Sequence, residues 1–547
     1  MHIRVVLQAR MTSARLPAKV LLPVSGIPMA ILCAKRIGRD GLDVVLATSD
    51  QQSDDLLVIE AEKNNIKVYR GSLNNVLSRY VDAISDLVDE NIVVRVTADN
   101  PVVDADFVRA LVNKFRESDI EYLGTQSPLD SLPYGLSAEV MTVKSIREAY
   151  NSTTHSDDLE HVTPWIRKNL KSNLVDGKQL TDNMDLSYLR CTVDSFHDYE
   201  RINKVFGVEG IDAIASPWTM LVDVLNKQVD SAEFNIPFRL KHSGINSLMA
   251  LGTVQLGLEY GAANKSGMPD SESATKIVRM AIEHGVNWID TARGYGVSEE
   301  RVGEALTGGW NSRARLVTKL DPLSEIDNLN TLECIKLAVE SSIYTSIYSL
   351  QLKSLDVLLL HRWEHRSYKD GRIWEVLLSL RSNGLINELG ASVYNEREAI
   401  DALGDPDVMH LQLPFNLLDH RWLNDKFQNA LKARPDVRIH VRSIFLQGLL
   451  INNAEVWPSW DKEAGKRVGL IDELVDSLGR KSKADLCVAF ISAYGWVDSL
   501  LVGVETIEQL ENNLVMFCEN PLTNKECELV IEKLSGAPDR LVNPAQW

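Results

Sequence analysis

The sequence has few cysteines and no long apolar run, and these two absences exclude several classes of protein. Six of the 547 residues are cysteine, scattered without a Cys-x-x-Cys pair or a Cys/His spacing typical of a metal site. We therefore expect reduced, buried thiols and a cytoplasmic protein. No stretch of about 18 apolar residues occurs, so no membrane span is expected. The apolar run Ile3–Ala9 is also too short for a signal peptide.

Basic residues are in the minority. Lys and Arg number 58 against 76 Asp and Glu, which gives a formal net charge of −18. A surface of that sign repels nucleic acid and anionic membranes, so neither is expected as a partner. The hydrophobic share of 45% and the charged share of 24% are ordinary for globular proteins, and they exclude a largely disordered chain.

Strand and helix patterns alternate along two stretches of the chain, which is typical of α/β domains. In the first stretch the alternation predicts a mostly parallel sheet. Its predicted strands are Ile3–Ala9, Asp43–Thr48, Lys67–Tyr69, Ile92–Thr97, Ile120–Gly124 and Leu189–Val193. Predicted helices between them include Asn75–Leu87 and Asp104–Glu117.

The second stretch predicts a (β/α)8 TIM barrel, because eight strand patterns alternate with helices over close to 300 residues. The predicted strands are Leu248–Gln255, Asn287–Ala292, Arg315–Leu320, Leu355–His361, Ile386–Val393, Val408–Leu413, Ile439–Ile444 and Leu500–Val504. Around 229–247 the pattern lapses into polar, non-periodic sequence. We therefore predict a first domain at 1–235, a linker at 236–247 and a second domain at 248–547.

A loop rich in cations follows the first predicted strand. The segment Gln8–Leu21 holds Arg10, Arg15 and Lys19 beside the hydroxyl of Ser13. Such a loop wraps a triphosphate with backbone N–H groups while the cations neutralise its charge. A charged loop on its own is usually just solvated, so the order of the residues has to decide.

That order resembles the nucleotide loop of the cytidylyltransferases that activate sialic-acid-like and ketodeoxy-octulosonate sugars, most closely the spore-coat polysaccharide type. Ala18 stands where this family usually has glycine. The resemblance implies an open, mostly parallel nucleotide-binding sheet of the nucleotidyltransferase (GT-A-like) kind. Further matching motifs lie at Ala47–Asp50, Arg70–Ser72, Val76–Tyr80, Val94–Pro101, Glu160–Thr163 and Thr192–Asp194.

The resemblance implies transfer of CMP from CTP to a small acidic sugar, with release of pyrophosphate. Asp99 lies just after one predicted strand and Asp194 at the end of another, and the resemblance makes them ligands of Mg²⁺. A strand-end aspartate also commonly caps a turn or helix, and this is the alternative for both. Arg79 and Glu139 are candidates for sugar contacts. The implied nucleotide-binding residues are Gln8, Arg10, Ser13, Arg15 and Lys19.

Polar residues also stand at, or just beyond, the ends of consecutive strands of the predicted barrel. Asp290 ends the second strand, with Tyr295 five residues later, Lys319 ends the third and His361 the fourth. Residues at the C-terminal ends of barrel strands are catalytic rather than structural in this fold. Each residue alone could be a surface charge or a packed ring, but the four in this order predict an active site.

This set resembles the catalytic residues of the aldo-keto reductase superfamily, over the whole second domain. Further matches lie at Gly252–Gly257, Gly390–Asn395, Gln412–Asn416, Ser443–Leu450 and Val502–Asn512. The resemblance implies that Tyr295 is the general acid and that Lys319, held by Asp290, makes it more acidic. His361 would orient the carbonyl. The implied NAD(P)(H) contacts are Ser392, Gln412, Ser443, Gln447, Gly503, Gln509 and Asn512.

One departure concerns the choice between NADP(H) and NAD(H). Many relatives place a cation shortly after the last cofactor-loop glycine, where it holds the 2′-phosphate of NADP. The corresponding stretch here, Gly503–Gln509, contains Glu505 and no Lys or Arg. A carboxylate repels a phosphate and accepts hydrogen bonds from ribose hydroxyls, so we expect NADH to be at least tolerated.

Together the two halves predict a bifunctional enzyme of surface-polysaccharide or glycoprotein sugar biosynthesis. It would transfer CMP to an acidic keto-sugar, and it would reduce or oxidise a sugar carbonyl or hydroxyl. Two alternatives stay open. The acceptor could be a sugar phosphate or alditol phosphate, or one domain could be idle and serve as a scaffold. Relatives of the first domain often dimerise, so a homodimer through that domain is a further expectation.

Overall fold

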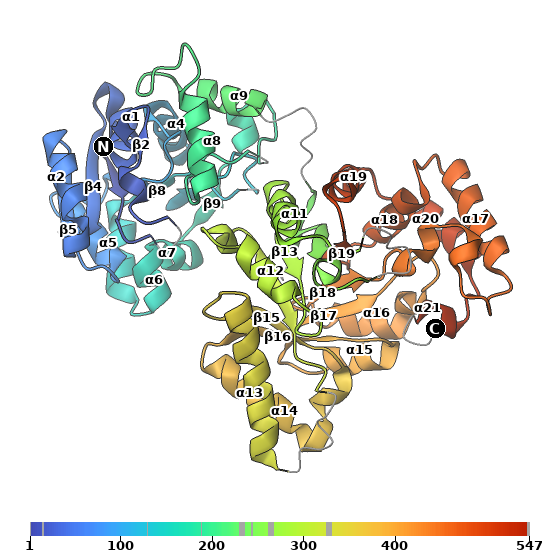
Figure 1. Cartoon of the computed structure of the whole chain (residues 1–547). Helices are drawn as coiled ribbons and strands as arrows, with labels where there is room; N and C mark the ends of the chain where they lie inside the picture. The colour runs from blue at the N-terminus through green and yellow to red at the C-terminus, as the bar shows by residue number, and fades with distance from the viewer. Residues whose placement is uncertain are drawn as a thin grey trace. The chain divides into compact units, whose positions relative to one another are not determined.

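The computed structural model describes residues 2–13, 16–127, 129–187, 189–228, 236–241, 244–260, 267–323 and 331–543. The chain divides into two compact units, Met1–Glu233 and Phe234–Trp547. The first unit runs from blue to green in Figure 1, and the second from light green to red. None of the helices in the described ranges is long and apolar enough to cross a membrane.

The first unit is built on a seven-stranded sheet with the order β5-β4-β1-β6-β8-β7-β9. Strand β8 is antiparallel to its neighbours β6 and β7, and the other pairs are parallel. The predicted open, mostly parallel sheet is therefore confirmed. The strands are β1 (Ile3–Gln8), β4 (Asp43–Ser49), β5 (Lys67–Gly71), β6 (Ile92–Thr97), β7 (Tyr122–Gly124), β8 (Glu139–Thr142) and β9 (Ser172–Leu174), beside a small hairpin of β2 (Pro23–Val24) and β3 (Ile27–Pro28).

Helices cover both faces of this sheet. In β1, Val5 and Leu7 pack into one core and Val6 packs into the other. Burial on both faces explains why the strand is almost continuously apolar. The first face is covered by α1 (Met29–Gly38), α2 (Asp55–Lys63), α4 (Ala105–Arg116), α8 (Phe196–Phe206) and α9 (Trp218–Gln228). The second face is covered by α3 (Val76–Ala83), α5 (Val143–Ser152), α6 (Ser156–His161) and α7 (Pro164–Asn169).

The strand order reverses between β1 and β6, and we call the carboxyl edge of the sheet at this point the crevice. From β1 the chain adds β4 and β5 on one side and then returns to the other side of β1 with β6. Open α/β sheets bind ligands at the carboxyl end of such a switch point. The loop after Gln8 and the aspartate Asp99 follow these two strands directly.

The strand predicted at Leu189–Val193 is wrong. This segment forms a single bridge, between Arg190 and Tyr134, and no extended ladder. Its position is fixed instead by the Val193 N–H, which donates to the Asp99 carbonyl at 2.8 Å. That bond brings Asp194 beside Asp99 without a strand.

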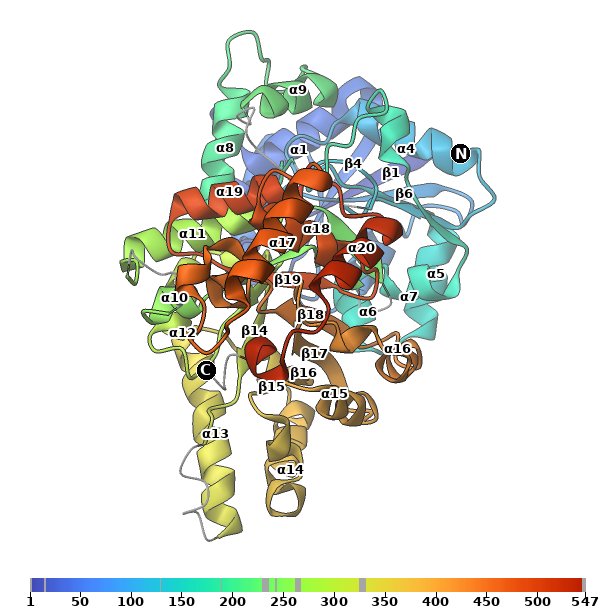
Figure 2. The same ribbon diagram turned by 90° about the vertical axis from the view of Figure 1, so that its right-hand side faces the viewer.

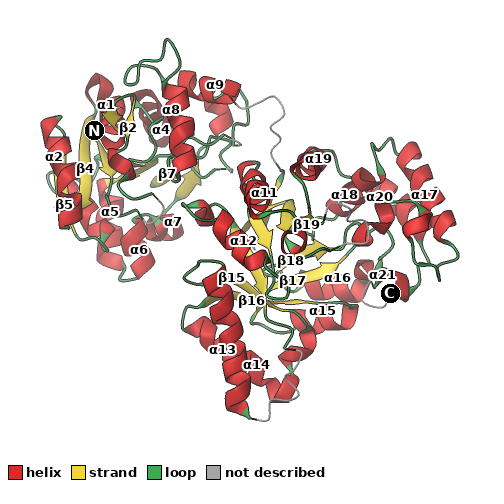
Figure 3. Cartoon of the chain, viewed as in Figure 1, coloured by secondary structure: helices red, strands yellow, loops and turns green. Residues whose placement is uncertain are grey.

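The second unit contains a closed barrel of eight strands, and all eight predicted strands are present (Figure 3). All neighbouring pairs are parallel, so the predicted (β/α)8 barrel is confirmed. The strands are β12 (Met249–Gly252), β13 (Trp288–Asp290), β14 (Arg315–Lys319), β15 (Leu355–Leu360), β16 (Ile386–Ser392), β17 (Val408–Pro414), β18 (Arg438–Arg442) and β19 (Ser499–Gly503).

Helices surround the barrel, and the last ones add a layer on one flank. In this layer α17 and α20 pack against one another, and α17 also contacts α18 (Figure 2). Helix α18 is buried over most of its length because it lies between the barrel and this layer. The helices are α10 (Val254–Gly257), α11 (Ser271–Glu283), α12 (Ser298–Ala305), α13 (Leu332–Ser349), α14 (Tyr368–Ser382), α15 (Glu396–Leu403), α16 (Asp425–Lys432), α17 (Ala464–Ser477), α18 (Lys483–Ser492), α19 (Ile507–Phe517), α20 (Asn524–Leu534) and α21 (Asp539–Val542).

Part of the segment proposed as a linker, 236–247, is folded as a hairpin. Strand β10 (Phe238–Lys241) pairs antiparallel with β11 (Gly244–Ser247). Asn246 is fully buried, and its side-chain oxygen accepts hydrogen bonds from Trp288 Nε1 and Arg438 Nε, each at 3.0 Å. Because Trp288 and Arg438 begin β13 and β18, the hairpin closes the N-terminal end of the barrel.

Candidate active sites

Lys19 lies between two carboxylates at the crevice of the first unit. Its ammonium group donates to Asp99 Oδ2 at 2.6 Å, to Asp194 Oδ1 at 2.8 Å and to the Val193 carbonyl at 2.9 Å. An ammonium group has three donors. All three are therefore used by protein oxygens, and Lys19 has to leave the carboxylates before it can bind a phosphate.

The charged groups of this cluster stabilise one another in their ionised forms. Burial alone would raise the pKa of Asp99 and lower that of Lys19, but their mutual attraction reverses both shifts, so the pKa of Asp99 lies below its usual range and that of Lys19 above. Arg190 binds Asp194 Oδ2 at 3.0 Å and Asp198 Oδ1 at 2.9 Å. Asp99 therefore stays ionised at neutral pH, which is the state in which it binds a cation.

The donor set of this cluster fits Mg²⁺. This ion is usually held by one or two carboxylates together with substrate phosphates and water. In the described part of the chain, no three His, Cys, Asp or Glu side chains come together as metal ligands. A metal ion held by Asp99 and Asp194 would therefore need oxygens from the nucleotide.

Of the other predicted nucleotide-binding residues, Gln8, Arg10 and Ser13 are described, in β1 and the loop that follows it. Gln8 ends β1, and its side-chain oxygen accepts a hydrogen bond from the Tyr80 hydroxyl at 3.4 Å. Arg10 is exposed and Ser13 is half-buried. Arg15 lies outside the described residues.

Asp54 anchors this loop, and the sequence reasoning missed it. The side chain is fully buried. Its Oδ1 accepts from the Met11 N–H at 2.8 Å, and its Oδ2 accepts from the Thr48 hydroxyl at 2.9 Å and the Ser49 N–H at 3.0 Å. Asp54 therefore joins the nucleotide loop to the end of β4. The sequence does contain a signal for this role, because Asp54 follows shortly after Thr48 and Ser49 at the end of β4.

The two proposed sugar contacts lie deeper than expected. Glu139 accepts hydrogen bonds from the hydroxyls of Tyr122 at 2.6 Å and Thr163 at 2.7 Å, and it pairs with Arg95. Its carboxylate is therefore occupied inside the sheet, which differs from the expected role. Arg79 is also buried, and its Nε and Nη1 have no hydrogen-bond partner among the described residues.

In the second unit, a cavity of about 600 Å³ opens at the C-terminal ends of the barrel strands. Every strand, or the residue after it, contributes to the lining. All eleven residues that the sequence predicts for catalysis and cofactor binding line this one cavity. They are Asp290, Tyr295, Lys319, His361, Ser392, Gln412, Ser443, Gln447, Gly503, Gln509 and Asn512.

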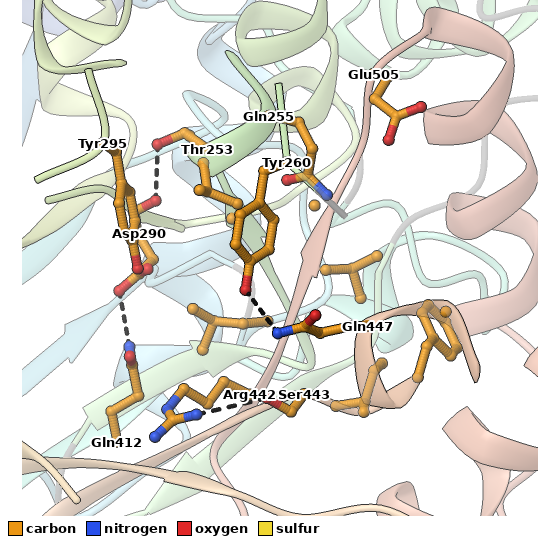
Figure 4. A pocket seen from close by; sticks show the side chains of 18 of the residues that line it. Thr253, Gln255, Tyr260, Asp290, Tyr295, Gln412, Arg442, Ser443, Gln447 and Glu505 are labelled. Carbon is orange, nitrogen blue, oxygen red and sulfur yellow. Dashed lines mark hydrogen bonds between the residues drawn. The ribbon is translucent and has the colours of Figure 1, made fainter. Parts of the chain in front are cut away.

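Asp290 is the centre of a buried polar network. Its Oδ1 accepts from Lys319 Nζ at 2.7 Å, and its Oδ2 accepts from Gln412 Nε2 at 2.7 Å (Figure 4). Burial alone would lower the pKa of Lys319, but Asp290 and Tyr295 raise it above its ordinary value. Lys319 therefore remains a cation although it is almost completely buried.

Tyr295 lies against both Lys319 and His361. The lysine Nζ is 4.8 Å from the centroid of the tyrosine ring, and the histidine ring packs edge-on with its centroid 6.2 Å away. The carbonyl of Tyr295 accepts a hydrogen bond from the Ser298 N–H at 3.1 Å, at the start of α12. Gly257 allows this turn to pack closely, since a Cβ there would lie 2.0 Å from the Tyr295 carbonyl oxygen.

His361 is held in its neutral form. Burial, together with the positive charges of Lys319 and Arg442, lowers its pKa from 6.5 to about 3. The neutral ring carries one N–H donor, and it adds no second cation next to Lys319. It is therefore suited to hold a carbonyl oxygen by a hydrogen bond.

We expect the pH profile of kcat/KM for carbonyl reduction to show no ionisation of His361 between about pH 5 and 8. The pKa in the folded protein lies below the ordinary value, so the neutral form is fully present above about pH 5 and is lost only as the pH falls towards 3. The measurement is the pH profile of kcat/KM for the wild type and for His361→Gln. A wild-type limb with a pKa near 6.5 that disappears in the variant would contradict the assignment.

The far end of the cavity is shaped by a close approach of two elements. A Cβ at Gly503 would lie 2.1 Å from Gln255 Oε1, so a larger residue there would displace the Gln255 side chain. Gln509 Oε1 accepts from the Glu505 N–H at 2.8 Å, and Gln509 Nε2 donates to the Glu505 carboxylate at 3.3 Å. Glu505 is thereby held at the rim of the cavity (Figure 4).

Three further lining residues were not predicted. Tyr260 accepts a hydrogen bond from Gln447 Nε2 at 3.2 Å (Figure 4). Tyr394 lies under the guanidinium group of Arg442. Arg442 ends β18, whereas the predicted strand Ile439–Ile444 placed it inside the strand. Polar residues at the C-terminal ends of barrel strands are active-site candidates, which is how Lys319 and His361 were predicted. With the correct strand end, the same criterion would have included Arg442.

Comparison with protein families agrees with this geometry. Residues 248–534 match the Aldo/keto reductase family. The chain belongs to the aldo/keto reductase family. Residues 4–208 match the Cytidylyltransferase family, so the reductase barrel is preceded by a cytidylyltransferase domain. Both resemblances inferred from the motifs are confirmed.

Individual relatives cover one domain or the other. The chain is 29% identical to the spore coat polysaccharide biosynthesis protein SpsF of Bacillus subtilis over 236 residues, which is 42% of this chain and 95% of that protein. It is 34% identical to the 3-deoxy-manno-octulosonate cytidylyltransferase of Dichelobacter nodosus over 118 residues, 21% of this chain and 47% of that protein. The solved aldo-keto reductase AKR11C1 of Bacillus halodurans is 20% identical, with a TM-score of 0.44, and the match covers 55% of this chain and 96% of that one.

Proposed function

We propose that the chain is a bifunctional enzyme that transfers CMP from CTP to an acidic keto-sugar and that reduces or oxidises a sugar carbonyl or hydroxyl with NAD(P)(H). One observation carries the proposal. Each unit presents a complete charged constellation at the carboxyl edge of its strands: Lys19 with Asp99 and Asp194 in one, and Asp290 with Lys319 beside Tyr295 in the other.

In the transferase reaction, the residues of the crevice would neutralise and align a triphosphate. Mg²⁺, when bound, would supply electrostatic stabilisation of the phosphate oxygens. Asp99 and Asp194 would hold it. Lys19, released from the carboxylates, would then be free to neutralise the leaving pyrophosphate, and Arg10 and Arg15 of the same loop would add further positive charge. The sugar hydroxyl attacks the α-phosphate, and pyrophosphate leaves.

In the reductase reaction, the barrel residues would handle the proton. The nicotinamide supplies hydride when it is bound. Tyr295 would donate its hydroxyl proton to the carbonyl oxygen, and the cation of Lys319 would stabilise the tyrosinate left behind. Asp290 holds Lys319 in position, and neutral His361 would donate a hydrogen bond to the same oxygen. Ser392, Gln412, Ser443, Gln447, Gly503, Gln509 and Asn512 would hold the cofactor.

The relatives support the sugar assignment. One relative of the first domain is named for spore-coat polysaccharide biosynthesis, and another for 3-deoxy-manno-octulosonate. We place this chain in the same kind of chemistry, the synthesis of an activated acidic sugar for a surface polysaccharide or glycoprotein. A homodimer through the first unit belongs to the same proposal, and the mass of the protein in solution tests it.

Two alternatives remain for the experiment to exclude. The acceptor of the first site could be a sugar phosphate or alditol phosphate, or one unit could be an idle scaffold. A thermal-shift screen across CTP, UTP, GTP and ATP with Mg²⁺ identifies the nucleotide, because a ligand that binds the native state stabilises it. Release of pyrophosphate is then assayed with acidic keto-sugars and with sugar phosphates. We expect stabilisation by CTP and release with an acidic sugar, and release with sugar phosphates alone would favour the first alternative.

The cofactor preference gives a further prediction. Glu505 lines the cavity, whereas Glu508 is exposed and does not. Glu505→Lys removes a repelling charge and adds an attracting one, so we expect the ratio of kcat/KM for NADPH over NADH to rise about 10-fold or more. Glu508→Lys makes the same charge change outside the cavity and should leave the ratio nearly unchanged. A wild type with a large preference for NADPH would refute the proposed tolerance of NADH.

A further inference from the structure

Arg442 is a cation that projects into the reductase cavity from the end of β18. It lines the same space as Tyr295, His361 and Tyr260. Its guanidinium carbon lies 4.5 Å from the centroid of the Tyr394 ring, and its Nη2 donates to the Val393 carbonyl at 3.1 Å. The stacked ring and the backbone bond hold the group in one orientation before any ligand arrives.

The charge of Arg442 is not neutralised by the protein. Among the described residues, no Asp or Glu forms an ion pair with it, whereas Arg438, at the other end of the same strand, pairs with Glu388 at 2.8 Å. The other cation of the cavity, Lys319, is bound to Asp290. Arg442 is therefore the cation of this cavity that remains available for a ligand. Its guanidinium group has five N–H donors, and its bonds to the Ser443 hydroxyl and the Val393 carbonyl use only two of them.

The position of Arg442 favours the reacting end of the cavity over its cofactor rim. Burial, Lys319 and Arg442 together lower the pKa of His361. The His361 ring packs edge-on against Tyr295, the proposed general acid, with the ring centroids 6.2 Å apart, so it belongs to the carbonyl side. The opposite rim carries Glu505, whose charge is negative. An anionic group of the substrate, placed beside the carbonyl, therefore has a fixed partner in Arg442.

We propose that Arg442 binds the carboxylate of the reductase substrate, so that the barrel acts on an acidic sugar and discriminates against neutral ones. This inference rests on the proposed reductase activity and adds the substrate class. Guanidinium and carboxylate groups form paired, charge-assisted hydrogen bonds, which give direction as well as affinity. The pyrophosphate of the cofactor is a second source of anionic oxygens, and the experiment separates the two. If the assignment holds, both units of the chain accept the same class of sugar.

The test uses the full-length protein with D-glucuronate and D-glucose as matched probes, since the two differ by a carboxylate in place of a hydroxymethyl group. Kd values for both sugars are measured by tryptophan fluorescence in the presence of saturating NADP⁺ or NAD⁺, and kcat/KM is measured for their reduction. Kd values for NADH and NADPH are measured separately. The variants are Arg442→Met, Arg442→Lys as the charge-conserving change, and Arg372→Met as the control. Arg372 is an exposed arginine on α14 that pairs with Glu375 and does not line the cavity.

We expect the wild type to bind D-glucuronate more tightly than D-glucose. Arg442→Met should weaken D-glucuronate binding about 10- to 100-fold, leave D-glucose and the cofactor within about threefold, and be partly rescued by lysine. Equal affinity of the wild type for both sugars would overturn the assignment. So would a cofactor Kd that rises about 10-fold in Arg442→Met with equal loss for both sugars, because Arg442 would then bind the pyrophosphate.

The failure of the proposed reductase function would look different. If neither sugar is reduced with either cofactor, the activity fails, while the Kd values still decide whether Arg442 binds the carboxylate. If both sugars are reduced without preference and bind equally, the activity stands and the role of Arg442 is refuted.

Discussion

Replacing Tyr295 by phenylalanine is expected to lower carbonyl reduction about 10²- to 10⁴-fold, the range that a positioned general acid contributes. The hydroxyl is the group that would protonate the carbonyl oxygen, and it lies beside Lys319 and His361 in the cavity. The ring remains, so the packing against His361 is kept. The fold should lose no more than about 1 kcal/mol, the usual contribution of one hydrogen bond. The measurement is kcat/KM for oxidation of NADH or NADPH by an aldehyde substrate.

The control for this variant is Tyr348→Phe, because Tyr348 is 84% exposed on α13 of the same barrel. It should reduce carbonyls at the wild-type rate. Pyrophosphate release by Tyr295→Phe should also be unchanged, because Tyr295 belongs to the second unit and Lys19, Asp99 and Asp194 belong to the first. Retention of reductase activity in Tyr295→Phe would show that another group supplies the proton.

Asp99→Asn is expected to lower nucleotidyl transfer about 100-fold or more, since a carboxylate ligand of the metal ion and one partner of Lys19 are removed together. Asp99 is the better choice of the two aspartates. Its side chain is 21% exposed, against 5% for Asp194, so its loss leaves less uncompensated buried charge. The second readout is the thermal shift caused by CTP with Mg²⁺, which should shrink in the variant.

Asp119→Asn provides the matched control, because the Asp119 side chain is 96% exposed at the surface of the same unit and pairs with Lys171. It should leave both pyrophosphate release and the CTP-dependent stabilisation unchanged. An Asp99→Asn protein that keeps full transfer activity and its Mg²⁺-dependent stabilisation would exclude Asp99 as a metal ligand.

The barrel could be predicted from the sequence because its signals are local. The strands are short apolar runs, several of which end at a polar residue, as at Asp290 and Lys319, and helix patterns follow them. The parallel sheet of the first unit was predictable for the same reason. The failures are the short or irregular segments. Strands β8 and β9 were not predicted. The segment Leu189–Val193 has the sequence pattern of a strand, but it is positioned by backbone hydrogen bonds with Asp99 and Tyr134.

The charged contacts within each site could not be predicted, because they join residues far apart in the sequence. Lys19 and Asp194 are 175 positions apart, and Gln412 reaches Asp290 over 122 positions. Residue type and strand-end position indicated that these side chains would share a site. They did not indicate that the lysine would occupy the carboxylates, or that the glutamine amide would donate to Asp290.

Ala18 illustrates a local departure with a structural cause. The resemblance places glycine at this position, and the backbone of Ala18 has φ 59°, in the left-handed region that favours glycine. Ala18 therefore holds a left-handed backbone conformation that glycine would adopt more easily. Lys19 follows directly, so this turn sets the direction from which the ammonium group enters the crevice.

The most direct test of the central claim is an incubation of the full-length protein with CTP, Mg²⁺, NADH, NADPH and a panel of acidic keto-sugars and matched neutral sugars, analysed by mass spectrometry. We predict pyrophosphate release and a CMP-linked acidic sugar, with a second product that differs by two hydrogens when a nicotinamide cofactor is present. Tyr295→Phe should remove the two-hydrogen change alone, and Asp99→Asn should remove the CMP-linked products. Absence of pyrophosphate with every acidic sugar, or a nicotinamide-dependent change confined to neutral sugars, would contradict the account.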